Sequence, residues 1–162
     1  PATDYSPDEL VNLWAHYAAE TELVDRHLGR ILQKIDDLAL WDDSIVVVTS
    51  DHGTSLGEHN RTGKSNICDH DERYWPIYPE VGHVPFLIAG GDIPRGKSLD
   101  MLAQPIDIQP TLSDLAGVGL EPPEAFEGRS FATRITATSR SPGRLCVRGR
   151  TPACRRSASR RG

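Results

Sequence analysis

The chain has 162 residues and a formal net charge of −5, and this length is enough for one domain with a packed core. Its apolar content of 38%, with three Trp and four Tyr, excludes an intrinsically disordered chain. No apolar run approaches the ~20 residues of a membrane-spanning helix, so we expect no membrane partner. The three cysteines form neither a metal-binding spacing nor a disulfide framework.

Charge divides the chain into two unlike parts. All 23 acidic residues lie in residues 1–136, whereas residues 137–162 carry eight arginines and no acid. We expect residues 1–136 to form a folded domain and residues 137–162 to be a basic, disordered tail. Such a tail could bind nucleic acid or acidic lipid. We favour the alternative that it is GC-rich DNA read out of frame, and we therefore expect no nucleic-acid partner.

A long helix is predicted near the start of the chain. Ser6 at the N-cap, Pro7 at the first helical position and Glu9 at the third are typical of a helix start. We expect the helix to end near Leu38 and its apolar stripe to pack on a sheet. Apolar residues recur at helical spacing along it, among them Leu10, Leu13, Trp14, Tyr17, Leu28, Ile31, Leu32 and Ile35.

The next segment combines a strand with polar residues at its end. Four consecutive β-branched residues, 45–48, predict a strand buried on both faces of a parallel sheet. Asp51 and His52 follow it, where open α/β sheets bind their ligands, and they are candidate metal ligands. Lys64 would add a positive charge nearby. The alternative, that Asp51 caps a turn and His52 is an ordinary hydrogen-bonded residue, would be preferred for an isolated Asp-His pair.

Three stretches of this segment together resemble the metal-site region of the sulfatases, within the alkaline phosphatase superfamily. They are Thr49-Ser50-Asp51-His52-Gly53, Leu56-Gly57-Glu58-His59 and Gly63-Lys64. The resemblance covers about residues 17–131 and implies an α/β fold, an alkaline-phosphatase-like α/β/α sandwich that is incomplete here. It implies that Asp51 and His52 bind a divalent cation, calcium first, and that Lys64 contacts sulfate or phosphate oxygens. An imidazole ligand suits Mn²⁺ or Zn²⁺ better than Ca²⁺, so these ions stay open.

The polar loop over residues 60–82 is expected to border the site. Aromatic residues beside two prolines suggest a stiff loop over a cleft. The acidic run 69–72 is either a second metal site or, as we favour, a solvated rim. Asp42 and Asp43 are interpreted as a polar turn, because they precede the strand instead of following it. The candidate rim residues, which we expect to lie near substrate, are His59, His70, Tyr74, Trp75 and Tyr78.

Two later elements also resemble sulfatase segments. Val84–Ala89 is predicted to be a strand, with a proline near its start where the missing N–H is tolerated. We expect it to lie in one sheet with Ile45–Thr49. Residues 107–117 are predicted to form a helix that ends at Gly117.

The nucleophile of the sulfatases is a Cys or Ser in a Cys/Ser-X-Pro/Ala-X-Arg motif, oxidised to formylglycine. None of the three cysteines fits this motif: Cys68 is followed by Asp-His-Asp-Glu, and Cys146 has Arg148 where Pro or Ala is required. We expect the nucleophile segment, two further acidic metal ligands and the true N-terminus to be missing. The chain by itself is therefore expected to be inactive, and no compartment can be assigned.

Three functions remain open. The first is part of a sulfuric ester hydrolase acting on a small-molecule or carbohydrate sulfate ester. The second is part of a phosphodiesterase or phosphonate monoester hydrolase of the same superfamily, since His at position 52 occurs in both. The third is a non-enzymatic binding module that uses the basic tail. The residues do not separate sulfate from phosphate and do not indicate an oligomeric state.

Overall fold

A computed structural model describes residues 5–64, 76–119, 127–137 and 145–148. In chain order its elements are α1 (Pro7–Asp37), β1 (Val46–Thr49), β2 (Ser55–Leu56), the 3-10 helix η1 (Glu58–Asn60), β3 (Thr62–Gly63), α2 (Pro79–Gly82), β4 (Phe86–Ala89), β5 (Ser98–Asp100), the 3-10 helix η2 (Pro105–Asp107), α3 (Ile108–Leu115), α4 (Ala132–Thr136) and β6 (Leu145–Arg148).

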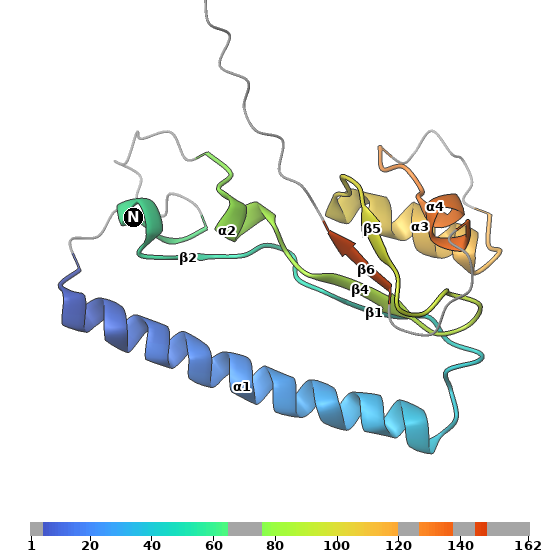
Figure 1. Cartoon of the computed structure of the whole chain (residues 1–162), viewed down its shortest axis with the longest axis horizontal. Helices are drawn as coiled ribbons and strands as arrows, with labels where there is room; N and C mark the ends of the chain where they lie inside the picture. Colours follow the sequence, from blue (N-terminus) through green and yellow to red (C-terminus); the bar gives the residue numbers. More distant parts are fainter. Residues whose placement is uncertain (1–4, 65–75, 120–126, 138–144, 149–162) are drawn as a thin grey trace, which may run out of the picture.

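The elements form layers, with a sheet between helices (Figure 1). The four strands of the larger sheet lie in the order β1-β4-β6-β5. The long helix α1 runs along one side of this sheet, and the short helices α3 and α4 lie on the other side (Figure 1). Strands β2 and β3 form a separate small hairpin, which lies beyond the C-terminal end of β1 (Figure 1). This mixed arrangement agrees with the predicted α/β class.

The start of α1 is confirmed in detail. The Ser6 side chain accepts from the backbone N–H of Glu9, and Glu9 Oε2 accepts from the backbone N–H of Ser6 at 2.8 Å. This reciprocal capping satisfies two N–H groups that a helix otherwise leaves without partners. The helix ends at Asp37, one residue before the predicted end.

The expected packing of α1 on the sheet is wrong for the described residues. No residue of α1 is buried, and Trp14 and Ile31 are about half exposed, at 51% and 59%. The helix is anchored mainly at its N-terminal part, where Trp14 Nε1 donates to the carbonyl of Leu56 at 2.7 Å. Leu28, Leu32 and Ile35 of its apolar stripe are half-buried. The helix has 31 residues, whereas the sheet strands have at most four. The described sheet is thus too narrow to cover the stripe.

The two predicted strands are neighbours in one sheet, as expected, but their direction differs from the prediction. Strands β1 and β4 are antiparallel, with Val47 opposite Ile88. Strand β1 is an edge strand among the described residues and is half-buried. Parallel pairing occurs only between β5 and β6 in this described sheet. Side chains of consecutive strand residues point to alternate faces whatever the direction of the neighbour, so the apolar run does not distinguish a parallel from an antiparallel pairing.

The predicted disorder of residues 137–162 is wrong for Leu145–Arg148. These residues form β6, which lies between β4 and β5, antiparallel to the first and parallel to the second. Leu145, Cys146 and Val147 interrupt the Arg-rich composition with β-compatible residues. A neighbouring strand can capture so short a run through main-chain hydrogen bonds alone. The rest of the tail beyond residue 137 lies outside the described residues.

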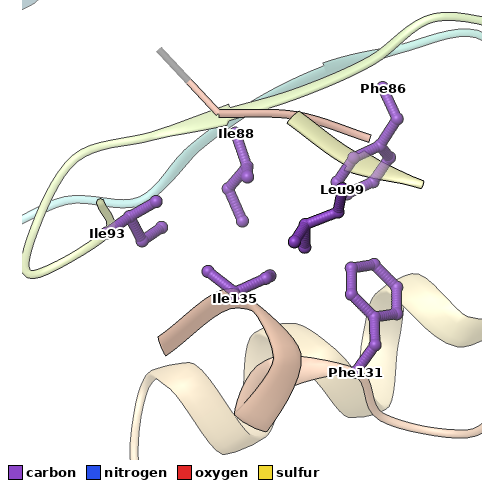
Figure 2. Close-up of a cluster of buried hydrophobic side chains, with 6 residues drawn as sticks. All are labelled: Phe86, Ile88, Ile93, Leu99, Phe131 and Ile135. Carbon is purple, nitrogen blue, oxygen red and sulfur yellow. The ribbon is translucent and has the colours of Figure 1, made fainter. Parts of the chain in front are cut away.

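The core lies between the sheet and the α3/α4 layer (Figure 2). Its buried side chains are Phe86, Ile88, Ile93, Leu99, Phe131 and Ile135. Phe86 and Phe131 meet edge-to-face, with ring centroids 5.7 Å apart, which is a favoured aromatic geometry. The core therefore holds β4 through buried side chains, and it holds β1 through the pairing with β4 and through Val47, which packs against the core.

Helix α3 confirms the predicted helix over 107–117. It runs to Leu115, and Gly117 adopts a left-handed conformation with φ of 68° just beyond its end. The buried Thr111 accepts from the backbone N–H of Phe131 at 3.1 Å, which attaches the chain before α4 to α3.

Candidate metal and anion site

The loop after β1 places two candidate ligands side by side. Asp51 Oδ1 accepts from the backbone N–H of His52 at 2.8 Å, and Ser50 Oγ donates to the carbonyl of His52 at 2.8 Å. Asp51 Oδ2 lies 3.2 Å from His52 Nε2. The two side chains therefore face the same point beyond the strand end instead of opposite faces.

The two ring nitrogens of His52 have different partners. Its Nδ1 lies 2.9 Å from the carbonyl oxygen of Gly53, and a carbonyl can only accept, so Nδ1 carries the hydrogen. The lone pair is then on Nε2, which lies 2.5 Å from Lys64 Nζ. Proteins commonly orient a metal-binding imidazole by a hydrogen bond such as the one from Nδ1 to the Gly53 carbonyl, made by the ring nitrogen that does not bind the metal.

The charges of the site favour an ionised carboxylate. The backbone N–H of His52 holds the pKa of the Asp51 carboxyl below its ordinary value, and the nearby positive charge of Lys64 acts in the same direction. Asp51 is largely exposed and His52 is partly exposed. A cation or an anion in solution can therefore reach these groups.

The Asp51-His52 pair fits a divalent cation. Ligands that sit roughly 2.0–2.6 Å from one ion at about a right angle lie about 2.8–3.7 Å from each other. The observed 3.2 Å between Asp51 Oδ2 and His52 Nε2 meets this condition. Within the described ranges, no group of three or more His, Cys, Asp or Glu side chains could hold a metal. The pair thus offers two candidate ligand atoms, one oxygen and one nitrogen.

The β2-β3 hairpin positions Lys64 near Asp51 and His52. Ser55 pairs with Gly63, and Lys64 follows directly. Gly57 is required in the turn, because its φ is 109° and an added Cβ would lie 2.5 Å from the side chain of Leu10 in α1. The hairpin is thus set between α1 and the loop that carries Asp51 and His52.

A third segment, the turn at α2, contacts the hairpin. The ring of His59 stacks on Tyr78, with centroids 3.7 Å apart and planes 8° from parallel. His59 Nε2 lies 3.2 Å from Glu80 Oε1. His59 itself is left-handed, with φ of 56°. The structure therefore places His59 against α2, and its role as a rim residue stays a prediction.

Comparison with known proteins gives the family. The family model for sulfatases matches residues 3–118. The chain belongs to the sulfatase family. Arylsulfatase K of Xenopus laevis is 29% identical to this sulfatase-family chain over 135 residues, 83% of the chain and 23% of the relative.

Two other relatives carry different names. The multifunctional alkaline phosphatase superfamily protein PehA of Trinickia caryophylli is 32% identical over 125 residues, 76% of the chain and 22% of the relative. The low-salt glycan biosynthesis sulfotransferase Agl7 of Haloferax volcanii is 36% identical over 110 residues, 68% of the chain and 25% of the relative. The sulfatase-family chain thus spans a quarter or less of the length of these relatives.

One serine of this sulfatase-family chain fits the letters of the nucleophile motif, although no cysteine does. Ser130-Phe131-Ala132-Thr133-Arg134 reads Ser-X-Ala-X-Arg, so the expectation that no segment matches needs this correction. Ala132 and Thr133 line a cavity together with Asp42 and Asp43, before β1, whereas Asp51 follows β1. The serine segment therefore lies at the end of the sheet away from the ligand pair.

The other predicted site residues divide into two groups. Asp42 and Asp43 lie in a turn before β1, as predicted. His70, Tyr74, Trp75 and the acidic run 69–72 lie outside the described residues. Sequence reasoning missed Glu80, because its partners Ser55 and His59 are 25 and 21 positions earlier in the chain. No local pattern around Glu80 indicates these contacts.

Proposed function

We propose that this chain supplies the electrostatic part of a site that hydrolyses a sulfate ester. In this proposal Asp51 and His52 are ligands of a divalent cation, and Lys64 contacts the sulfate oxygens. The observation that carries it is the convergence of the three groups, with 3.2 Å from Asp51 to His52 and 2.5 Å from His52 to Lys64. Membership of the sulfatase family supports the hydrolase class.

Each residue has a defined task in this mechanism. The Gly53 carbonyl holds the His52 ring so that Nε2 would be the nitrogen that binds a cation, and Asp51 would contribute a negative charge. A bound divalent cation would stabilise an anionic nucleophile and polarise the ester. Lys64 would offset the negative charge that develops on the sulfate oxygens. One such electrostatic contact is typically worth on the order of 10²–10³ in rate.

The identity of the cation is part of the proposal. The family resemblance favours Ca²⁺, whereas the imidazole of His52 suits Mn²⁺ or Zn²⁺ better. Mn²⁺ is a useful probe because its paramagnetism reports binding directly. Asp51→Ala should weaken Mn²⁺ binding to the chain by on the order of 10-fold or more, since it removes the charged ligand of the pair.

Lys64→Ala should have the opposite effect on Mn²⁺ binding. Its Nζ occupies the Nε2 lone pair of His52 in the free chain, so its removal frees a ligand and should raise the Mn²⁺ affinity. Asp8→Ala, at an exposed acid in the first turn of α1, is the matched control. If Asp51→Ala and Asp8→Ala behave alike, Asp51 is a turn cap and the metal-site proposal fails.

Activity is tested in a longer protein. We propose that the 162-residue chain alone does not turn over sulfate esters. Fusing an upstream sulfatase segment with a Cys-X-Pro/Ala-X-Arg motif, and co-expressing the formylglycine-generating enzyme, should yield hydrolysis of 4-nitrophenyl sulfate. In that protein Lys64→Ala should chiefly lower kcat, by on the order of 10²–10³. Robust hydrolysis by the present chain would contradict the proposal and direct attention to Ser130.

A second candidate function is hydrolysis of a phosphodiester or phosphonate monoester. The observation that favours it is the similarity to PehA, which is named as multifunctional; the imidazole at position 52 is compatible with both candidates. Assaying 4-nitrophenyl sulfate and bis-4-nitrophenyl phosphate side by side separates the two classes. A kcat/KM that is higher for the phosphodiester would favour the second candidate.

A further inference from the structure

We propose that Glu80 is a positioning residue that holds the hairpin carrying Lys64 against the loop carrying Asp51 and His52. Glu80 touches neither His52 nor Lys64 in the contacts described above, and it would act through Ser55 and His59. This inference rests on the proposed function of Asp51, His52 and Lys64. It explains how the ammonium group of Lys64 is kept close to Asp51 and His52.

The Glu80 carboxylate joins two points of the hairpin. Its Oε1 accepts from Ser55 Oγ at 3.4 Å and lies 3.2 Å from His59 Nε2. Ser55 is completely buried, at 0% exposure. A buried hydroxyl without an acceptor is costly, so Ser55 favours the position in which Glu80 is close. Ser55 also pairs with Gly63, the residue before Lys64.

Helix α2, which carries Glu80, also contacts the loop of residues 51–53, here called the ligand loop. The backbone N–H of Gly53 donates to the carbonyl of Val81 at 2.8 Å. A Cβ at Gly53 would lie only 2.0 Å from the carbonyl oxygen of Glu80, so the two segments are in close main-chain contact. Helix α2 is therefore connected to the ligand loop by its backbone and to the hairpin by the Glu80 side chain.

The hairpin depends on such external contacts. Its strands β2 and β3 have two residues each, and isolated short hairpins are at best marginally stable in water. Its turn contains left-handed residues, His59 and Asn60, with φ of 56° and 54°, a conformation that non-glycine residues adopt at a cost. Contacts with Glu80, Tyr78 and α1 therefore decide where the hairpin, and with it Lys64, lies.

The test uses the full chain labelled with ¹⁵N-histidine, without any ligand. The ring nitrogens of His52 report its hydrogen bonds, because the resonance of Nε2 depends on whether an ammonium group donates to it. Lys64→Ala should shift this resonance. Glu80→Ala should shift it in the same direction, by at least half as much. In the double variant, Glu80→Ala should add nothing to the effect of Lys64→Ala.

The controls separate positioning from general loss of structure. Glu22→Ala removes an exposed glutamate of α1 that pairs with Arg26, and it should leave the His52 resonances unchanged. His59→Asn removes the imidazole at Glu80 but keeps a residue that tolerates left-handed backbone. It should shift the His52 resonance in the same direction by a smaller amount, and it decides the question if Glu80→Ala does not fold.

Each outcome has a defined meaning. If Lys64→Ala moves the His52 resonance and neither Glu80→Ala nor His59→Asn does, the positioning role is overturned and the proposed function stands. An additive effect of Glu80→Ala in the double variant would also overturn it, because Glu80 would then act on His52 without Lys64. If Lys64→Ala itself leaves His52 unchanged, the contact between them is absent and the proposed site fails.

Discussion

At the scale of single residues, main-chain groups organise the candidate site as much as side chains do. The N–H of His52 orients the Asp51 carboxylate, and the carbonyl of Gly53 orients the His52 ring. Gly53 also lets α2 approach, because it has no Cβ. These contacts explain why three adjacent residues, 51–53, contribute different parts of one site.

Gly53→Ala should destabilise the chain. The new Cβ would lie 2.0 Å from the carbonyl oxygen of Glu80, so either the ligand loop or α2 must move. Overpacking of this kind typically costs about 1–3 kcal/mol. Urea unfolding followed by circular dichroism measures the change in the free energy of unfolding.

Gly29→Ala is the matched control for this substitution. Gly29 lies inside α1, and nothing lies within 4 Å of a Cβ added there. Alanine in a helix interior is more favourable than glycine by roughly 0.5–1 kcal/mol, so this variant should be stabilised. Equal effects of the two substitutions would show that the close approach at Gly53 is not present.

At the scale of secondary elements, α1 shows how local signals define a helix without defining its surroundings. Its first residue follows from Ser6, Pro7 and Glu9, which act within one turn. The side of the helix that meets other elements is decided far away, at Leu56 and Gly57 in the hairpin. The contribution of the capping box can therefore be tested by changing a single residue in the first turn of α1.

Acid should weaken the start of α1 through Glu9. Hydrogen bonds from the backbone and side chain of Ser6 hold the Glu9 pKa below its ordinary value of 4.5. A lowered pKa in the folded state means that the stabilisation is present above the unfolded-state pKa and is lost as pH falls through the folded-state pKa. Helicity at 222 nm should therefore fall below pH 4.5.

Glu9→Gln isolates this contribution. Glutamine can complete the capping box but does not titrate. The difference in helicity between the native chain and the variant should therefore change with pH only in the acid range. A constant difference from neutral pH to acid would show that the Glu9 carboxylate does not stabilise α1.

At the scale of the whole molecule, stability is concentrated on one side of the sheet. The main cluster of buried hydrophobic side chains lies between the strands and the α3/α4 layer (Figure 2), whereas α1 buries none of its residues. The proposed ligand pair lies just beyond β1, which pairs with β4 and whose Val47 packs against the core. Loss of the core should therefore disturb the site even though no core residue belongs to it.

Ile135→Ala should destabilise the chain strongly. Ile135 is completely buried, at 0% exposure, in the main core. Removing such a side chain typically costs about 2–5 kcal/mol, including the cavity that it leaves. The measurement is the urea midpoint together with the free energy of unfolding.

Ile31→Ala makes the same chemical change on the uncovered side of α1. Ile31 is 59% exposed, so the change should stay within about 0.5 kcal/mol of the native chain. A loss comparable to that of Ile135→Ala would show that the stripe of α1 is buried in solution, by another part of the chain or by a second copy.

The sequence by itself determined the features that depend on neighbouring residues. These are the start of α1, the existence of β1 and β4, the helix that ends before Gly117 and the polar group Asp51-His52 beyond β1. Helix caps, turn glycines and runs of β-branched residues act over a few positions, so they can be recognised in one dimension. The family resemblance rested on the same short segments and was confirmed by the family match over residues 3–118.

Only the tertiary structure decided how these parts meet. Three contacts join residues far apart in the chain: the antiparallel pairing of β1 with β4, the pairing of β6 with β4, and the contact of Glu80 with Ser55 and His59. Main-chain hydrogen bonds form in both parallel and antiparallel strands, and a carboxylate accepts from any nearby donor. The choice among partners therefore depends on which surfaces the whole fold brings together, and no local pattern contains that information.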